Sequence, residues 1–253
     1  MNATITQRLI TACAAACFAI SAHPMMQAQG TDLVPHLSPD GIAVAAQQAK
    51  GLLAPDAELV FIGALGHSMY DAGGGTTVLL EVDLATGTST AWVYAFYSPS
   101  KNERTMLAAV DIPDLGYQAM PASSPVPIPT ITQAVETSLP YSSSAAMVGR
   151  LAADSVYRRY RAEYPAAFPQ ALAYRPFSDA DSALLPAWFP RNAPVWITRF
   201  TGGGDSAMVC YVSGGNGATW CSRGAAASVP AGSSRRPDRL NLSSTGERRA
   251  AGH

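Results

Sequence analysis

The segment Gly66-His67-Ser68-Met69 comes nearest to a catalytic motif in this sequence. It matches the beginning of the Gly-x-Ser-x-Gly elbow, in which a nucleophilic serine sits between a strand and a helix. The fifth position holds Tyr70 instead of glycine, and residues 71–75 (DAGGG) cannot begin a helix. A triad also needs a base, and the remaining histidines either precede the serine or lie in ends expected to be flexible: His23, His36 and His253. A loop is therefore the favoured interpretation, and a secreted serine hydrolase that uses Ser68 is the alternative.

Other ligand-binding patterns are incomplete. Asp179 and Asp181 could contribute to a calcium site, but no full Asp-x-Asp-x-Asp-Gly loop surrounds them. A polar surface loop that caps a helix explains them better. The glycine runs at residues 73–75 and 202–204 lack the Lys-Ser/Thr of a phosphate-binding loop and precede expected strands, which favours hairpin turns. We therefore predict neither a metal nor a cofactor.

The first residues of the chain predict export. Arg8 is followed by an uncharged run of small and apolar residues, 9–22, which has the length of a signal-peptide core and is too short to cross a bilayer. We expect residues 1–22 to be a cleavable signal and residues 23–37 a flexible leader, so that the protein works in the periplasm or the medium. A retained anchor and a lipoprotein signal ending at Cys13 are the alternatives.

Export removes the two cysteines of the signal and leaves Cys210 and Cys221 in the mature chain. A disulfide is expected in such a compartment. Gly214-Gly215-Asn216-Gly217 lies between the cysteines, and a hairpin centred on this segment places them opposite each other. The same register pairs Tyr211 with Trp220 on the other face. The sequence therefore predicts a Cys210–Cys221 disulfide across a hairpin.

An expected helix in the second half carries several arginines and tyrosines. They are Tyr157, Arg158, Arg159, Tyr160, Arg161 and Tyr164. A basic and aromatic stretch can bind nucleic acid. Export and a formal net charge of -1 favour a solvated helix face with snorkelling arginines instead. We therefore expect no nucleic-acid partner.

The composition supports a folded core, with 48% hydrophobic and only 14% charged residues. Apolar periodicity and β-branched runs predict helices at residues 41–53 and 144–164, and strands at residues 58–65, 76–84, 89–97, 105–112, 168–174, 194–200, 207–212 and 218–221. The prolines of residues 113–143 indicate a semi-extended linker, and residues 223–253 are expected to be a disordered tail.

The two halves repeat one pattern. In each, a helix stops at a proline, Pro55 or Pro165, and a Trp-[Val/Ile]-x-x-Phe strand follows later. We expect these strands to place Trp92, Phe96, Trp196 and Phe200 in the core. The predicted fold is α+β, with two tandem modules at residues 38–112 and 144–222. Each module is a helix packed on a three- to four-stranded antiparallel sheet.

A helix before Pro55-Asp56-Ala57, followed by strands that include Val82-Asp83-Leu84-Ala85-Thr86-Gly87, resembles the PepSY domain of exported bacterial proteins. The second half departs from this pattern, with Val212-Ser213-Gly214-Gly215 in place of the acidic turn. The resemblance implies a helix on a three- or four-stranded sheet and an exported protein. Some PepSY modules act as inhibitory or chaperone-like segments beside peptidases, and the resemblance carries over no catalytic residue.

The expected function is therefore that of an exported, non-enzymatic binding or modulating protein. The expected partner is a protein or peptide, such as a peptidase or another envelope protein. Besides the hydrolase, a purely structural envelope protein is an alternative. Nothing in the sequence identifies the partner itself.

Overall fold

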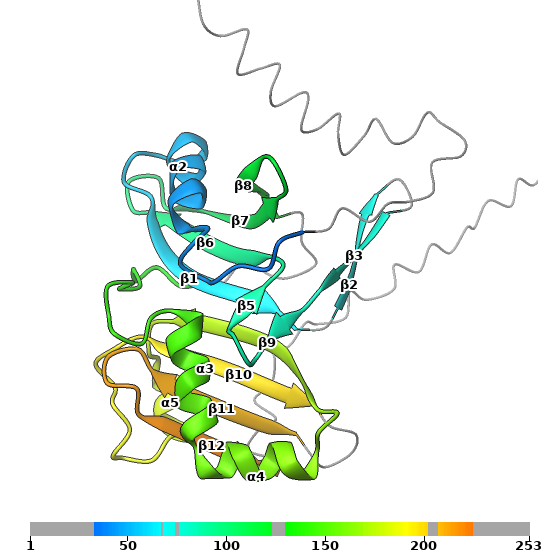
Figure 1. Ribbon diagram of the computed structural model, residues 1–253. Coiled ribbons are helices and arrows are strands. Elements are labelled where there is room, and N and C mark those ends of the chain that lie inside the picture. Colours follow the sequence, from blue (N-terminus) through cyan, green and yellow to red (C-terminus); the bar gives the residue numbers. More distant parts are fainter. Residues whose placement is uncertain (1–32, 67, 74–75, 123–129, 202–206, 225–253) are drawn as a thin grey trace, which may run out of the picture.

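The computed structural model (Figure 1) describes residues 33–66, 68–73, 76–122, 130–201 and 207–224. The predicted signal, most of the predicted leader and the predicted tail from residue 225 onward lie outside these residues.

The main element is an antiparallel sheet of eight strands in the order β12-β11-β10-β9-β1-β6-β7-β8. In chain order these strands are β1 (Glu58–Leu65), β6 (Trp92–Ser98), β7 (Glu103–Ile112), β8 (Gly116–Pro121), β9 (Phe168–Arg175), β10 (Val195–Thr201), β11 (Met208–Ser213) and β12 (Thr219–Arg223). The predicted α+β class with antiparallel strands is confirmed.

The two halves share this one sheet. Strands β1 and β9 are neighbours at its centre, with Ile62 paired to Tyr174 and Leu65 paired to Ala171. The sequence predicted two sheets of three or four strands, one for each half. The structure joins them edge to edge, because each first strand leaves an unpaired side that the other covers.

Two short ribbons are inserted between β1 and β6. Strands β2 (Ser68–Gly73) and β3 (Thr76–Leu80) form a ribbon that projects from the main sheet (Figure 1), and β4 (Val82–Asp83) pairs with β5 (Thr88–Ser89). The single strand predicted for residues 76–84 is thus divided between β3 and β4. The turn predicted from residue 71 begins later, because β2 continues to Gly73.

Four helices accompany the sheet in the described residues: α2 (Ile42–Leu52), α3 (Ser144–Ala153), α4 (Ser155–Glu163) and α5 (Asp179–Leu184). Helix α2 packs on β6, β7 and β8, whereas α3 and α4 contact β11 and β12. The one helix predicted for residues 144–164 is broken at Asp154, whose backbone is extended and whose carboxylate accepts the N–H of Tyr157 at 2.9 Å. An aspartate in this role starts a new helix.

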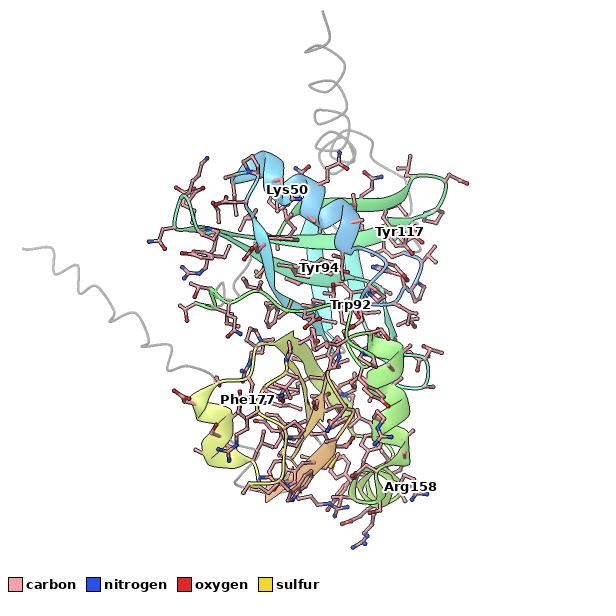
Figure 2. All side chains as sticks on the ribbon, turned by 90° about the vertical axis from the view of Figure 1, so that its left-hand side faces the viewer. Lys50, Trp92, Tyr94, Tyr117, Arg158 and Phe177 are labelled. Carbon is pink, nitrogen blue, oxygen red and sulfur yellow. A yellow bond between two sulfur atoms is a disulfide. The ribbon has the colours of Figure 1, made fainter. Side chains whose placement is uncertain are left out.

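Aromatic side chains of the two halves meet in the core beneath the helices. Trp92, Phe96, Trp196 and Phe200 are all buried, as predicted. The rings of Trp92 and Trp196 lie edge to face with 6.2 Å between their centroids. Figure 2 shows Trp92 where the two halves adjoin. Burial of such large side chains is the main favourable contribution to folding.

Two segments predicted to be irregular take part in the fold. In the predicted leader, Val34 bridges to Asp111 and His36 bridges to Ser89, so residues 33–37 belong to the folded domain. The predicted linker, residues 113–143, contains strand β8 and also donates the N–H of Val135 to the carbonyl of Leu59 at 2.8 Å. Prolines at the end of β8 and after it are compatible with this strand, because an edge strand needs no backbone N–H donor on its outer side.

Candidate functional site

Ser68 does not lie in a nucleophile elbow. It is the first residue of β2 and pairs with Leu80 of β3. A strand therefore follows the serine where the elbow needs a helix. His36, which precedes the serine in sequence, lies in the bridge to Ser89 beside β5. His67 lies outside the described residues.

Asp179 and Asp181 lie in the first turn of α5. Asp181 is 1% exposed, and its two carboxylate oxygens accept from the guanidinium of Arg175 at 2.7 Å each. It also completes a capping box with Ser178 at the start of α5. Burial raises the pKa of Asp181, but hydrogen bonds from Arg175 and Ser178 outweigh it and hold that pKa below its ordinary value. In the described residues no group of three or more His, Cys, Asp and Glu side chains is placed to hold a metal ion.

The arginines of α4 point outward and its tyrosines inward. Arg158 and Arg159 are exposed, while Tyr157 and Tyr160 are buried against the sheet. Arg161 donates to the carbonyl of Ala167. This is the arrangement expected of a helix face in water.

Cys210 and Cys221 form the predicted disulfide between β11 and β12, with their Cα atoms 4.1 Å apart. The predicted register is also present, since Tyr211 pairs with Trp220 and their ring centroids are 5.9 Å apart. This bond lies in the outermost strand of the second half, where it holds β12 on the sheet.

The opposite end of the sheet is open. Among the described residues, β8 has a strand neighbour on one side only. The N–H of Ala122 donates to the carbonyl of Met106 at 2.9 Å. Since hydrogen bonding alternates along an antiparallel strand, the backbone groups of Tyr117 and Ala119 face away from β7. Pro121 supplies no donor, which limits the open stretch to a few residues.

Large apolar side chains lie along this open edge. Leu115 in the turn before β8 is 65% exposed, Met120 is 39% exposed and Tyr117 is 36% exposed. Tyr117 and Met120 point to opposite faces of the sheet, because side chains alternate along a strand. A segment added at this free edge would therefore meet an apolar side chain on either face.

Carboxylates flank the same edge. Asp111 of β7 is paired with Tyr117 of β8. Burial and the charges of Asp40 and Asp111 raise the pKa of the Tyr117 hydroxyl. The ring of His36 meets that of Tyr117 edge-on at 5.2 Å between centroids. Burial lowers the pKa of His36, although the carbonyl of Val34 and the two aspartates oppose this effect. The edge is therefore apolar with an acidic border.

Sequence analysis missed this site because residues 113–143 were interpreted as a linker. The local signal for a hairpin was present. Asp114, Leu115 and Gly116 form the turn, with Asp114 and Gly116 in the left-handed conformation that Asp and Gly tolerate. Tyr117, Gln118 and Ala119 then alternate between apolar and polar as in a strand. The many later prolines outweighed this short pattern.

Comparison with protein-family models, curated proteins and solved structures finds no match for this chain. In the described residues no helix has both the length and the apolar character needed to cross a membrane.

Proposed function

We propose that this chain is an exported, non-enzymatic binding protein whose edge strand β8 pairs with an extended segment of a partner protein. The observation that carries the proposal is that β8 has one free edge among the described residues and exposed apolar side chains along it: Leu115 in the preceding turn, and Tyr117 and Met120 on opposite faces of the strand. Addition of a strand to an open sheet edge is a general mode of peptide recognition, in which main-chain hydrogen bonds supply affinity and side chains supply selectivity.

The edge also limits the chemistry of the partner. Outward N–H and C=O groups at Tyr117 and Ala119 favour a short extended segment. Exposed apolar side chains favour apolar residues in that segment. Asp40 and Asp111 next to Tyr117 favour basic residues beside them. The partner segment is therefore extended, apolar and positively charged.

For the fold, we propose that the chain consists of two tandem PepSY-like modules. In each half a helix precedes four strands of the sheet, β1-β6-β7-β8 or β9-β10-β11-β12. The indole N–H of Trp92 donates to the carbonyl of His36 at 2.8 Å, and that of Trp196 donates to the carbonyl of Tyr141 at 3.0 Å. Both acceptors precede the first helix of their half. This correspondence supports duplication of one module.

Binding of a defined peptide tests the edge. The probe is a fluorescent eight-residue peptide of alternating lysine and valine, and its affinity is measured by anisotropy with the purified chain. Ala119→Pro removes the outward N–H, so we expect roughly tenfold or greater loss of affinity, the range of one or two hydrogen bonds. Ala119→Val is the matched control, because it adds similar bulk and keeps the N–H.

The proposal fails if Ala119→Pro and Ala119→Val bind the peptide equally well while both remain folded by circular dichroism. It fails equally if a peptide of alternating glutamate and valine binds as tightly as the lysine peptide. Hydrogen exchange should in addition protect the amides of β8 when the peptide is bound.

A further inference from the structure

A cavity of about 310 Å³ lies between the second half of the chain and the segment that leads to α3. Three segments that are distant in sequence form its walls. Glu136 comes from the segment that leads to α3, and Asn192 comes from the loop before β10. The third wall is formed by Ser213 at the end of β11 and by Gly215 and Asn216 of the turn that follows. Its volume is at the small end of the range of ligand pockets.

A buried hydroxyl lies in the wall of this cavity without a hydrogen-bond partner. Ser213 is 1% exposed, and its Oγ bonds to no described group, although its backbone N–H donates to the carbonyl of Ala218 at 2.9 Å. A buried polar atom left unpaired is costly, so such atoms in native proteins call for an explanation. Ser213 is among the residues that line the cavity, so a hydrogen-bonding ligand there would supply the missing partner.

The absence of a side chain at Gly215 keeps this wall accessible. A Cβ atom built at Gly215 would lie 3.1 Å from the Cβ of Ala193 and 3.8 Å from the Oγ of Ser213. Any larger residue would therefore fill the space between the turn and the loop before β10. Gly215 is not in the left-handed region, so packing explains this glycine better than backbone conformation does.

The polar groups around the cavity favour a ligand that carries a positively charged hydrogen-bond donor. Glu136, which is exposed, contributes the single charged side chain among the eight described residues that line the cavity. The Oε1 atom of Glu136 accepts from the hydroxyl of Ser138 at 2.8 Å. A carboxylate accepts up to about four hydrogen bonds, so capacity remains for a ligand. Asn192 and Asn216 add amide groups, and Leu139 and Pro190 add apolar surface.

We propose that this cavity binds a primary alkylammonium group, with the ammonium at Glu136 and its methylene chain against Leu139 and Pro190. The ammonium belongs either to a free diamine or to a lysine side chain of a bound polypeptide. This site is distinct from the β8 edge, because none of its lining residues belongs to β8 or to the turn before it.

Calorimetric titration of the purified chain with 1,5-diaminopentane tests the proposal. We expect saturable binding, and no binding of 1,5-pentanediol, which has the same length without the charge. Glu136→Gln should weaken diamine binding by up to about fivefold, the range for an ion pair at an exposed carboxylate. Glu103→Gln is the matched control: Glu103 is an exposed glutamate of β7 outside the cavity, and its loss should leave the affinity unchanged.

A second variant and a peptide pair complete the test. Ser213→Ala should weaken diamine binding several-fold while the chain stays folded. A short lysine peptide compared with its acetyl-lysine counterpart reveals the source of the ammonium: tighter binding of the lysine peptide than of the diamine indicates a polypeptide ligand, and the reverse indicates a free diamine.

Three outcomes would overturn the proposal. They are equal binding of the diol, equal losses in Glu136→Gln and Glu103→Gln, and the absence of saturable binding by both diamine and lysine peptide, which leaves ordered water as the only content of the cavity. Ala119→Pro should not alter diamine binding, so failure at this cavity and failure at the β8 edge can be told apart.

Discussion

At the residue scale, Cys210 and Cys221 hold the outermost strand of the second half on the sheet. Their bond closes a loop with a sequence separation of 11 residues. In the chain-entropy model a loop of this size stabilises the folded state by about 3 kcal/mol. The bond also lies where a strand has a neighbour on one side only, so β12 depends on it more than an inner strand would.

We predict that Cys210→Ala with Cys221→Ala lowers the free energy of unfolding by about 3 kcal/mol in urea titrations. The wild-type chain in reductant keeps both sulfur atoms and separates the effect of the cross-link from that of packing. An unchanged unfolding midpoint in reductant, with both thiols verified as free, would contradict the prediction.

A second residue-scale prediction concerns Asp181 and pH. Its pKa is lowered in the folded state, so the carboxylate stabilises the fold above its unfolded pKa of about 3.9, and this contribution is lost as pH falls through the folded pKa. Asp181→Asn should cost about 3 kcal/mol near neutral pH, because Arg175 loses its partner. The difference from wild type should shrink below pH ~4 in urea unfolding series. A constant difference across that range would count against this role.

At the element scale, two serines join the starts of α2 and α3. The N–H of Ser38 donates to the Oγ of Ser144 and the N–H of Ser144 donates to the Oγ of Ser38, each at 3.0 Å. Both serines are buried, so neither N–H has water as a substitute. The carbonyl of Ser38 accepts in addition from the hydroxyl of Tyr94 at 2.8 Å. This pair orients the two helices over one core.

Replacement of either serine should destabilise the protein. Ser38→Ala or Ser144→Ala leaves one buried N–H unpaired, at a cost of about 1–3 kcal/mol in the free energy of unfolding. Ser155→Ala is the control, since Ser155 is an exposed serine at the start of α4. Effects of equal size at Ser155 and Ser144 would show that helix propensity, and not the reciprocal pair, is being measured.

At the scale of the whole molecule, the seam between β1 and β9 makes one sheet of two halves. Backbones approach closely there. The N–H of Gly66 donates to the carbonyl of Gln170 at 2.9 Å, and a Cβ at Gly66 would lie only 1.6 Å from the carbonyl oxygen of Pro169. Glycine is required at this position because any side chain would separate the strands.

We therefore expect both halves to unfold together. Gly66→Ala should lower the opening free energy of β6 and of β10 alike, as measured by hydrogen exchange of peptides from each strand. Gly149→Ala is the matched control, because nothing lies within 4 Å of a Cβ at this exposed position in α3. It should be neutral or stabilise by up to ~1 kcal/mol. Two separate unfolding transitions, or a loss confined to one half, would refute a single cooperative unit.

Local patterns explain the features that could be predicted from the sequence. The hairpin of Cys210 and Cys221 follows from the symmetry of a short turn, and the strands with Trp92 and Trp196 follow from apolar runs of β-strand length. Local patterns predicted the structure less well where two opposing sequence signals lay close together. Asp154 interrupts an otherwise periodic helix, and the strand that begins at Gly116 lies next to a proline-rich segment.

The sequence by itself determined the α+β class, most of the strands and the disulfide, because turn symmetry and side-chain periodicity act between near neighbours. Only the tertiary structure decided that β1 and β9 pair, that Ser38 bonds to Ser144, and that Glu136, Asn192 and Ser213 surround one cavity. These contacts join residues that are far apart in the chain. Their formation depends on which unpaired edges and buried polar groups remain once each half has folded, and no local pattern encodes that.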